Sequence, residues 1–367
     1  MTRIVDEHLF LTGGTGFIGS RLARAWLRRT EARVTLLVRP HGRSRDSRRG
    51  GETLVGDESQ RARIAERTEF VTGDLGAPAM GLAPEDAALL AESVTHIIHA
   101  GADLRFNLPL DRARRVNTSG TAAALDFARR CPNLMAFQYL GTAYVAGRRR
   151  GVVREEGANG ATGHNNSYER SKYEAEKLVD RAMADLPASV LRPTIVTCDL
   201  ADGYCPDTSA FYRLLAGIAS GLLTVLPGRS DTMLDMVPVD FVVEAAFAIA
   251  RRPDAAGRYF HLGAGEENLI SLGDLSALAC HTFGREPTRI VSGAEFQAWA
   301  DRMRRRVPEA GRFLDEVALY APYLEGHARF DDRNTRGAMN GTSLPPRAMI
   351  EYFDRIASYV RDRTHRS

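Results

Sequence analysis

The chain has 367 residues, of which 44% are hydrophobic and 26% charged, and its formal net charge is +3. This composition is typical of a globular protein, and the length suits a nucleotide-binding domain with a smaller substrate domain. The small net charge, without a basic stripe interleaved with aromatic residues, argues against a nucleic-acid partner.

The apolar runs and the cysteines indicate where such a protein works. No apolar stretch approaches the ~18 residues of a membrane span, and the first apolar run is a strand candidate, so we expect neither a membrane span nor a signal peptide. The cysteines are scattered without metal-ligand spacing and are expected as reduced thiols in the cytoplasm, with no metal site. They are Cys131, Cys198, Cys205 and Cys280.

Short apolar runs alternate with helical patterns through the first 200 residues. Strands are predicted at 8–12, 33–38, 68–71, 95–99, 134–140 and 188–196. Helices are predicted at 16–28, 84–92, 118–130 and 168–185. This beta-alpha-beta rhythm predicts an α/β fold, a Rossmann-type doubly wound parallel sheet.

After residue 197 the alternation changes to mixed helices. Helices are expected near 209–221, after Asp240 and after Ser271, with a short strand at 259–262. We therefore expect a dinucleotide-binding Rossmann domain at 1–197 that carries the catalytic residues. A smaller mixed substrate-binding region is expected at 198–367, some segments of which return to the first domain.

The most specific local motif follows the first strand: Thr12-Gly13-Gly14-Thr15-Gly16-Phe17-Ile18-Gly19. Gly13 permits a tight turn, Gly16 lets the backbone approach a pyrophosphate, and Gly19 lets helix and strand pack closely. The pyrophosphate would lie at the N-terminus of the following helix, where free N–H groups favour anions. A plain glycine loop is the alternative, but the strand before it and the helix after it favour dinucleotide binding.

The end of the second strand indicates which dinucleotide is bound. An NAD site of this kind usually has Asp or Glu about 20 residues beyond the glycines, whereas this chain has Arg39, with Arg43 and Arg45 close behind. A guanidinium group binds a 2′-phosphate through forked hydrogen bonds. NADP(H) is therefore favoured over NAD(H), although a solvated basic loop would look similar.

A possible proton donor lies further along the chain. Only two of the 49 basic residues are lysines, and one of them, Lys172, follows Tyr168 by one helical turn. A nearby ammonium stabilises a phenolate and lowers the pKa of the phenol, so this pair suits proton transfer to a carbonyl oxygen. Thr142, after the fifth strand, would bond the same oxygen. Alone, the pair could also be two ordinary helix-surface residues.

In combination, these motifs resemble the extended short-chain dehydrogenase/reductase family. The matching segments, in the family's order, are Thr12–Gly19, Gly73-Asp74-Leu75, His99-Ala100-Gly101-Ala102, Asn117-Thr118-Ser119-Gly120-Thr121, Thr142, Tyr168-x-x-x-Lys172 and Leu191-Arg192-Pro193-Thr194. More narrowly, His99–Phe106, Leu140–Gly147 and Val237–Asp240 resemble the fatty acyl-CoA reductase and thioester reductase branch (male sterility, NAD-binding). Gly141 and Gly101 depart from the usual Ser and Ala of that branch.

The resemblance implies roles for these residues. The implied catalytic residues are Thr142, Tyr168 and Lys172, of which Lys172 also holds the nicotinamide ribose. Asp74 would bond the adenine edge, Asn117 would fix backbone near the active site, and Arg192 would lie near the nicotinamide. The implied cofactor-binding set is Thr12, Gly13, Thr15, Gly16, Phe17, Ile18, Gly19, Arg39, Asp74, Leu75, Ala100, Gly101, Asn117, Lys172, Pro193 and Thr194.

The predicted function is NADPH-dependent reduction of an acyl thioester to an aldehyde or alcohol. Because the resemblance includes no adenylation or carrier domain, the acyl group would arrive on coenzyme A or a free-standing carrier protein. A sugar-nucleotide epimerase or a hydroxysteroid-like dehydrogenase on the same scaffold is the alternative. A non-catalytic NADP(H)-sensing protein is disfavoured because both Tyr168 and Lys172 are present.

Overall fold

The structure is a computed structural model that describes residues 6–40, 64–158, 163–206, 208–326, 328–342 and 344–364. Arg43 and Arg45, considered above for phosphate binding, lie outside the described residues.

A seven-stranded parallel sheet forms the centre of the described molecule. Its spatial order is β12-β7-β5-β4-β1-β2-β3. The strands are β1 (His8–Thr12), β2 (Arg33–Val38), β3 (Thr68–Thr72), β4 (His96–His99), β5 (Ala136–Leu140), β7 (Ala188–Pro193) and β12 (Tyr259–Leu262). The strand order reverses between β1 and β4, so the carboxyl ends of these two strands form the crevice where open α/β sheets bind ligands. The predicted doubly wound Rossmann-type fold is confirmed.

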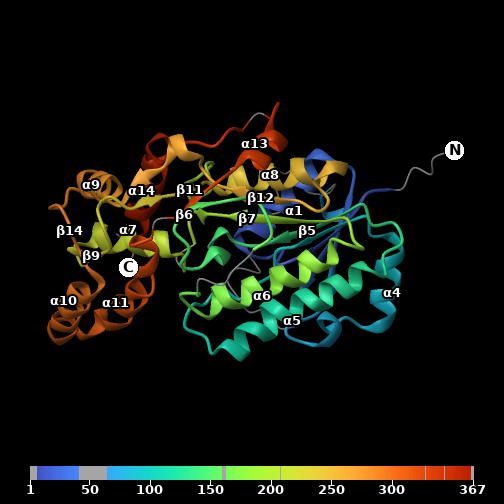
Figure 1. The fold of residues 1–367 in the computed structure, drawn as a ribbon, viewed down its shortest axis with the longest axis horizontal. Helices are drawn as coiled ribbons and strands as arrows, with labels where there is room; N and C mark the ends of the chain where they lie inside the picture. The colour runs from blue at the N-terminus through green and yellow to red at the C-terminus, as the bar shows by residue number, and fades with distance from the viewer. Residues whose placement is uncertain are drawn as a thin grey trace.

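Helices cover both faces of the sheet (Figure 1). One face carries α4 (Pro84–Ser93), α5 (Leu110–Ala128) and α6 (Ser167–Ala182); the other carries α1 (Phe17–Arg29) and α8 (Val239–Ala250). The alternation of side chains along a strand explains this arrangement. In β1, Leu9 and Leu11 enter the core under α1 and α8, whereas Phe10 enters the core under α5.

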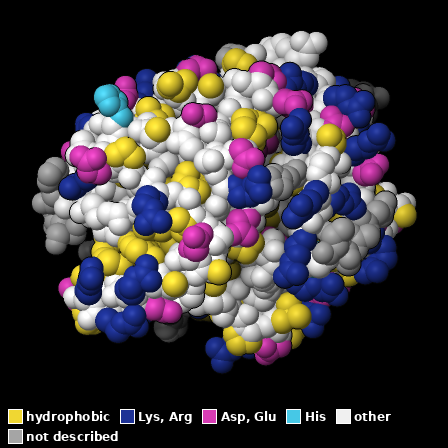
Figure 2. All heavy atoms as spheres, turned by 60° about the vertical axis from the view of Figure 1, so that its left-hand side comes forward, with side chains coloured by type: hydrophobic (Ala, Val, Ile, Leu, Met, Phe, Trp, Pro, Cys, Tyr) yellow, Lys and Arg dark blue, Asp and Glu magenta, His cyan; other side chains and the backbone are white. Residues whose placement is uncertain are grey.

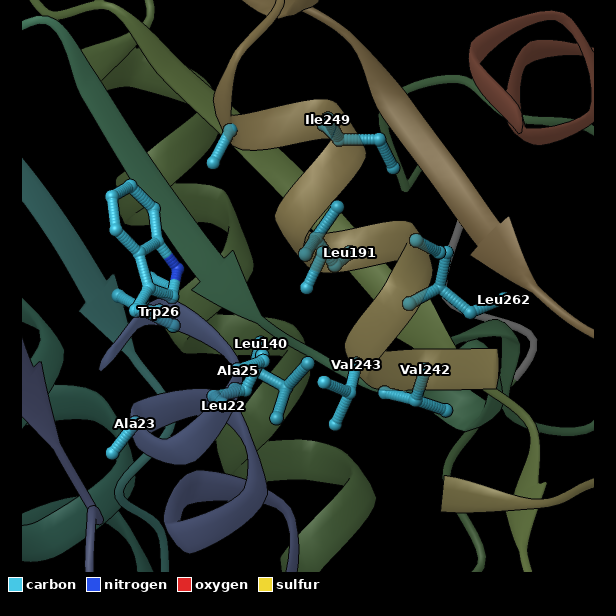
Figure 3. Close-up of a cluster of buried hydrophobic side chains, with 14 of the residues drawn as sticks. Leu22, Ala23, Ala25, Trp26, Leu140, Leu191, Val242, Val243, Ile249 and Leu262 are labelled. Atoms are coloured by element: carbon cyan, nitrogen blue, oxygen red, sulfur yellow. The ribbon is translucent and has the colours of Figure 1, made fainter. Parts of the chain in front are cut away.

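The core beneath α1 and α8 holds the glycine-rich end of β1 in place. Figure 3 shows Leu22 and Trp26 of α1 directed toward Leu140 and Leu191 of the sheet, with Val242 of α8 on the other side. Trp26 is fully buried. Burying a large apolar side chain contributes about 1.5–3 kcal/mol, so this contact fixes α1 against the sheet.

A second region, on the left in Figure 1, has a separate apolar core. Its helices are α7 (Ala210–Ser220), α9 (Leu272–Phe283), α10 (Gly293–Arg306), α11 (Gly311–Ala318), α12 (Ala321–Leu324) and α14 (Phe353–Thr364). Four short strand pairs accompany the main sheet: β6 (Gly151–Val153) with β15 (Ala328–Phe330), β8 (Ile195–Val196) with β11 (Met236–Val237), β9 (Val225–Pro227) with β14 (Arg289–Val291), and β10 (Met233–Leu234) with β13 (Ile270–Ser271). The last two pairs contribute to the core of this second region. The remaining helix, α13 (Arg333–Met339), packs against α8 and β12.

The main sheet also takes in chain from beyond residue 197. β12 pairs with β7 in parallel register, Tyr259 opposite Val190, and α8 packs on α1. Segments from both sides of residue 197 therefore build one sheet. The division of the chain into two domains at this residue stays a prediction.

Most predicted elements agree with the structure to within a few residues. The largest difference is α5, which begins at Leu110, whereas the predicted helix began at 118. The first two turns of α5 were missed because they are rich in arginine and show little apolar periodicity. The predicted strand at 188–196 divides into β7 and β8 after Pro193.

Candidate active site

A cleft of about 1990 Å³ opens at the carboxyl ends of the strands and is lined from both halves of the chain. Among its lining residues are sixteen that the sequence predicted. They are Gly13, Thr15, Gly16, Phe17, Ile18, Gly19, Arg39, Asp74, Leu75, Ala100, Gly101, Thr142, Tyr168, Lys172, Pro193 and Thr194. The structure thus brings together residues from seven segments between β1 and β8.

The glycine turn after β1 has the shape that a dinucleotide requires. Gly13 has a φ of +71°, and a Cβ there would lie 2.7 Å from the Gly101 backbone. A Cβ at Gly19 would lie 2.1 Å from the Gly13 carbonyl oxygen. Both positions therefore exclude any side chain.

The N-terminus of α1 is open to an anion. Its N-cap is Gly16, with no side-chain cap, and no acidic residue stands in the first turn. The free N–H groups and the helix dipole favour a phosphate at this point. The residues present therefore fit the pyrophosphate of a dinucleotide.

The part of the cleft next to β2 and β3 contains Arg39 and Asp74. Arg39 is exposed at the carboxyl end of β2 and lines the cleft. Asp74 follows β3, and one of its carboxylate oxygens accepts a hydrogen bond from the Gly76 N–H at 2.8 Å. The Asp74 side chain is exposed and also lines the cleft, so its carboxylate is accessible to a nucleobase edge.

Positive charge is unevenly distributed over the surface. On the face shown in Figure 2, Lys and Arg side chains gather in a band over the right-hand half of the view.

Thr142 and Tyr168 form the centre of the predicted chemistry. Thr142 follows β5 and caps the short 3₁₀ helix η2 (Ala143–Ala146), accepting from the Tyr144 N–H at 3.3 Å. Tyr168 stands in the first turn of α6, and its side chain lines the same cleft as that of Thr142. Burial raises the pKa of Tyr168 to about 12, and the Thr142 side chain partly offsets this rise. The phenol is therefore protonated at neutral pH.

Lys172 points away from the phenol. Its ammonium Nζ donates to the Leu140 carbonyl oxygen at 2.8 Å and lies 4.2 Å from the centre of the Tyr139 ring. Burial lowers the pKa of Lys172 to about 7, and the Glu176 carboxylate counteracts part of this shift. Lys172 is not among the groups that shift the Tyr168 pKa in this structure, so the lowering of that pKa by Lys172 stays a prediction.

Two predicted cofactor residues support the cleft without lining it. Thr12 Oγ1 accepts from the Gly101 N–H at 3.1 Å and bonds His99 Nδ1 at 2.8 Å. Asn117 accepts from the Asp103 N–H at 2.8 Å, and its amide donates to the Asp103 carbonyl oxygen and to Ser171 Oγ. Asn117 lies inside α5 rather than at its start, and it connects the loop after β4 to α6.

Arg192 lies away from the cleft, contrary to the expectation that it stands near the nicotinamide. Alternate residues of β7 face opposite sides of the sheet, so Pro193 lines the cleft while Arg192 enters the core. Arg192 donates to the Glu176 carboxylate at 2.7 Å, and both side chains are almost fully buried.

Asp235 was not singled out from the sequence, yet it fixes the cleft wall. It is almost fully buried and accepts from Thr194 Oγ1 at 3.0 Å and from the Ala264 N–H at 2.7 Å. Burial raises the pKa of Asp235 to about 6. Nothing in its neighbourhood, Leu234-Asp235-Met236, signals this role.

The wall beside Tyr168 is apolar. The Phe106 ring stacks on the Tyr168 ring with centroids 5.5 Å apart, and Tyr320 packs edge-on against Phe106 at the same separation. Further apolar residues that line this part of the cleft are Leu104, Leu108 and Leu319. Two aromatic residues from beyond residue 200, Tyr204 and Tyr320, line the cleft, whereas Phe211, Tyr212, Tyr323 and Phe330 are not among the lining residues.

The part of the chain that the structure describes holds neither a metal-ligand cluster nor a membrane-spanning helix. No group of three or more His, Cys, Asp or Glu side chains there could hold a metal ion. In the same residues, no helix has the length and apolar character needed to cross a membrane.

The fold and the cleft together define an α/β protein of the Rossmann type with a dinucleotide-binding turn. The chain belongs to the male sterility protein family of NAD-binding proteins, whose family model matches residues 11–246.

Three known proteins illustrate the likeness. Fatty acyl-CoA reductase wat of Drosophila melanogaster is 28% identical over 280 residues, covering 67% of this chain and 54% of its own length. A subunit of linear gramicidin synthase from Brevibacillus parabrevis is 30% identical over 329 residues, covering 87% of this chain but 6% of its own. The crystal structure of the terminal R domain from the myxalamid PKS-NRPS biosynthetic pathway superposes with a TM-score of 0.82 at 26% identity, covering 98% of this chain and 91% of that one. The chain thus spans about half the length of the fly reductase.

Proposed function

We propose that this protein is an NADPH-dependent reductase of an acyl thioester, giving an aldehyde or an alcohol. The observation that carries the proposal is that Thr142, Tyr168 and the glycine turn line one cleft, with the Thr142 side chain among the groups that act on the Tyr168 phenol. The fly relative is named a fatty acyl-CoA reductase, and the myxalamid R domain belongs to a PKS-NRPS pathway. These names favour a thioester carried on coenzyme A or on a carrier protein.

NADPH is proposed because of the charge at the end of β2. Arg39 lines the cleft there, in the place where an NAD site usually has a carboxylate. Arginine can bind a 2′-phosphate with two parallel hydrogen bonds, whereas a carboxylate would repel it.

The chain's own residues would orient the substrate and supply a proton. The carbonyl oxygen would accept hydrogen bonds from Thr142 and Tyr168, which stabilise the negative charge that develops on it. Bound NADPH would supply the hydride to the carbonyl carbon. Tyr168, protonated at neutral pH, would then donate its proton to the resulting alkoxide, a stronger base than a phenolate, which gives a hemithioacetal. The C–S bond of the hemithioacetal would then break, and the hydroxyl proton would pass to the departing thiolate, so that an aldehyde and a free thiol are released. The alcohol would require a second hydride and a second proton. Lys172, with a pKa of about 7, can exchange protons near neutrality and is proposed to hold the ribose.

The acyl group would lie against the apolar wall. Phe106 and Tyr320 stand next to the Tyr168 ring, so the carbons adjacent to the carbonyl would meet aromatic surface rather than charge. Burial of each methylene there contributes about 0.8 kcal/mol, which favours an acyl chain over a sugar.

The first experiment mixes the purified protein with NADPH or NADH and a panel of acyl-CoA, acyl-pantetheine and UDP-sugar substrates. Oxidation is followed at 340 nm and products by mass spectrometry. We expect NADPH consumption with an aldehyde or alcohol from the thioesters. A converted sugar without net NADPH loss would contradict the proposal and establish the epimerase alternative.

The proton donor is tested by Tyr168→Phe, with Tyr173→Phe as the control. Tyr173 stands on the same helix, but its ring packs against His164 outside the cleft. General acid catalysis contributes about 10²–10⁴-fold, so kcat should fall by that factor in Tyr168→Phe alone. Equal activity in the two variants would remove Tyr168 from the chemistry.

A further inference from the structure

Tyr323, on the short helix α12, touches the start of the helix that carries Tyr168. The two positions are 155 residues apart in the chain. The Tyr323 hydroxyl accepts a hydrogen bond from Asn166 Nδ2 at 2.8 Å, and the Glu169 carboxylate is close enough to raise the pKa of this phenol. Tyr323 is not among the residues that line the cleft, so it acts on the site through others.

Its two partners define the first turn of α6. Asn166 is the N-cap, and its Oδ1 accepts from the Glu169 N–H at 2.9 Å. Glu169 is fully buried and also accepts from the Asn165 N–H at 2.7 Å. Tyr168 stands between these residues, so the direction of its side chain depends on how this turn is held.

The Tyr323 ring also belongs to the aromatic wall. It packs on Phe106 with centroids 5.4 Å apart and on Tyr144 at 5.0 Å, and Phe106 in turn stacks on Tyr168. Three residues before Tyr323, Tyr320 lines the cleft beside the same Phe106. A single side chain therefore contacts both the substrate-side segment and the turn that carries the phenol.

We propose that Tyr323 is a positioning residue that couples the segment lining the substrate side of the cleft to the N-terminus of α6, and thereby holds Tyr168 in its reactive direction. This inference rests on the proposed function, in which Tyr168 is the proton donor. In this proposal the Tyr323 hydroxyl joins α12 to the first turn of α6. The contacts of the ring would remain if only the hydroxyl were removed, so the two contributions can be separated.

The test is Tyr323→Phe, which removes the hydroxyl and keeps the ring. Misplacement of a reacting group by about 1 Å can cost ~100-fold in rate, so a partial loosening of the turn should lower kcat about tenfold. The KM for NADPH should not change, because Tyr323 touches no residue of the glycine turn. Tyr212→Phe is the control: it removes a hydroxyl from the same C-terminal region, outside the cleft.

A second variant, Asn166→Ser, keeps a capping oxygen but loses the amide that donates to Tyr323. It should lower kcat to a similar degree, and the double variant should be no slower than either single one, because all three break the same link. Circular dichroism confirms folding of each variant.

Three results would overturn the positioning role: a kcat for Tyr323→Phe within about twofold of the parent, additive losses in the double variant, or a fall in kcat matched by an equal rise in the KM for NADPH. Failure of the proposed function gives a different result. In that case Tyr168→Phe itself stays active, and the basis for a role of Tyr323 in catalysis is lost with it.

Discussion

Replacing Arg192 with methionine should destabilise the molecule strongly, because it strands a buried carboxylate. The Arg192 guanidinium donates to both oxygens of Glu176, at 3.0 and 2.7 Å, and the two side chains are 2% and 1% exposed. Breaking a buried pair by removing one partner costs about 3–5 kcal/mol. Arg192 also donates to the Glu156 carbonyl oxygen and bonds His261, which puts the expected loss at the upper end.

The free energy of unfolding is measured by urea titration followed by circular dichroism. A loss of this size is a large fraction of the free energy of unfolding of a typical domain, which is about 5–15 kcal/mol. Arg252→Met is the matched control, because Arg252 pairs with Asp254 at the surface, where the side chains are 39% and 56% exposed. Such pairs contribute about 0–1 kcal/mol. The double variant Arg192→Met with Glu176→Met should recover most of the loss, because no charge is then left buried. If Arg192→Met cost no more than Arg252→Met, the reasoning would be refuted.

Three further predictions concern the cofactor and pH. Arg39→Glu should raise the KM for NADPH about tenfold or more relative to that for NADH, as steady-state kinetics will show; an unchanged ratio would exclude Arg39 from the cofactor site. Gly19→Ala should abolish nucleotide binding in a fluorescence titration, whereas Gly337→Ala, whose Cβ would meet nothing within 4 Å, should bind normally. Stability should fall as the pH is lowered from 7 to 5, because burial lowers the pKa of His164 and, to about 4 or below, that of four further histidines. The unfolded chain then takes up protons that the folded one does not, at about 1.4 kcal/mol per proton and pH unit. Asp235, with its pKa raised to about 6, opposes this by one proton; urea unfolding that gave equal or greater stability at pH 5 would contradict the sign. The four further histidines are His8, His96, His99 and His261, with pKa values of about 4, 4, 3 and 3.

The parts of the fold that the sequence predicted are those set by local rules. Strands buried on both faces appear as continuous apolar runs, and β1 and β2 begin and end where predicted. The helix after Ser271 was predicted from capping-box spacing, and the Ser271 side chain does accept from the Asp274 N–H. The glycine turn is local in the sequence, because its glycines stand within seven positions of one another, although the backbone that excludes a side chain at Gly13 is that of Gly101.

The parts that were missed depend on contacts between distant residues. The hydrogen bond of Tyr323 to Asn166 joins positions 157 apart, and that of Asp235 to Thr194 spans 41. No periodicity or spacing encodes such pairs. The direction of Lys172 was missed for a related reason: it is set by the Leu140 carbonyl oxygen, a backbone group that any residue at that position would present.

The position of β12 in the main sheet limits how this protein can be divided. A fragment ending near residue 197 would lack the strand that pairs with β7 and the helix α8 that covers Trp26. Its sheet would end in an unpaired edge beside an exposed apolar face, a combination that promotes aggregation. The substrate-binding region could therefore not be transferred to another nucleotide-binding domain as one continuous piece of chain. Residues 239–250 and 259–262, which form α8 and β12, would have to stay with the main sheet, so the transferred region would be discontinuous.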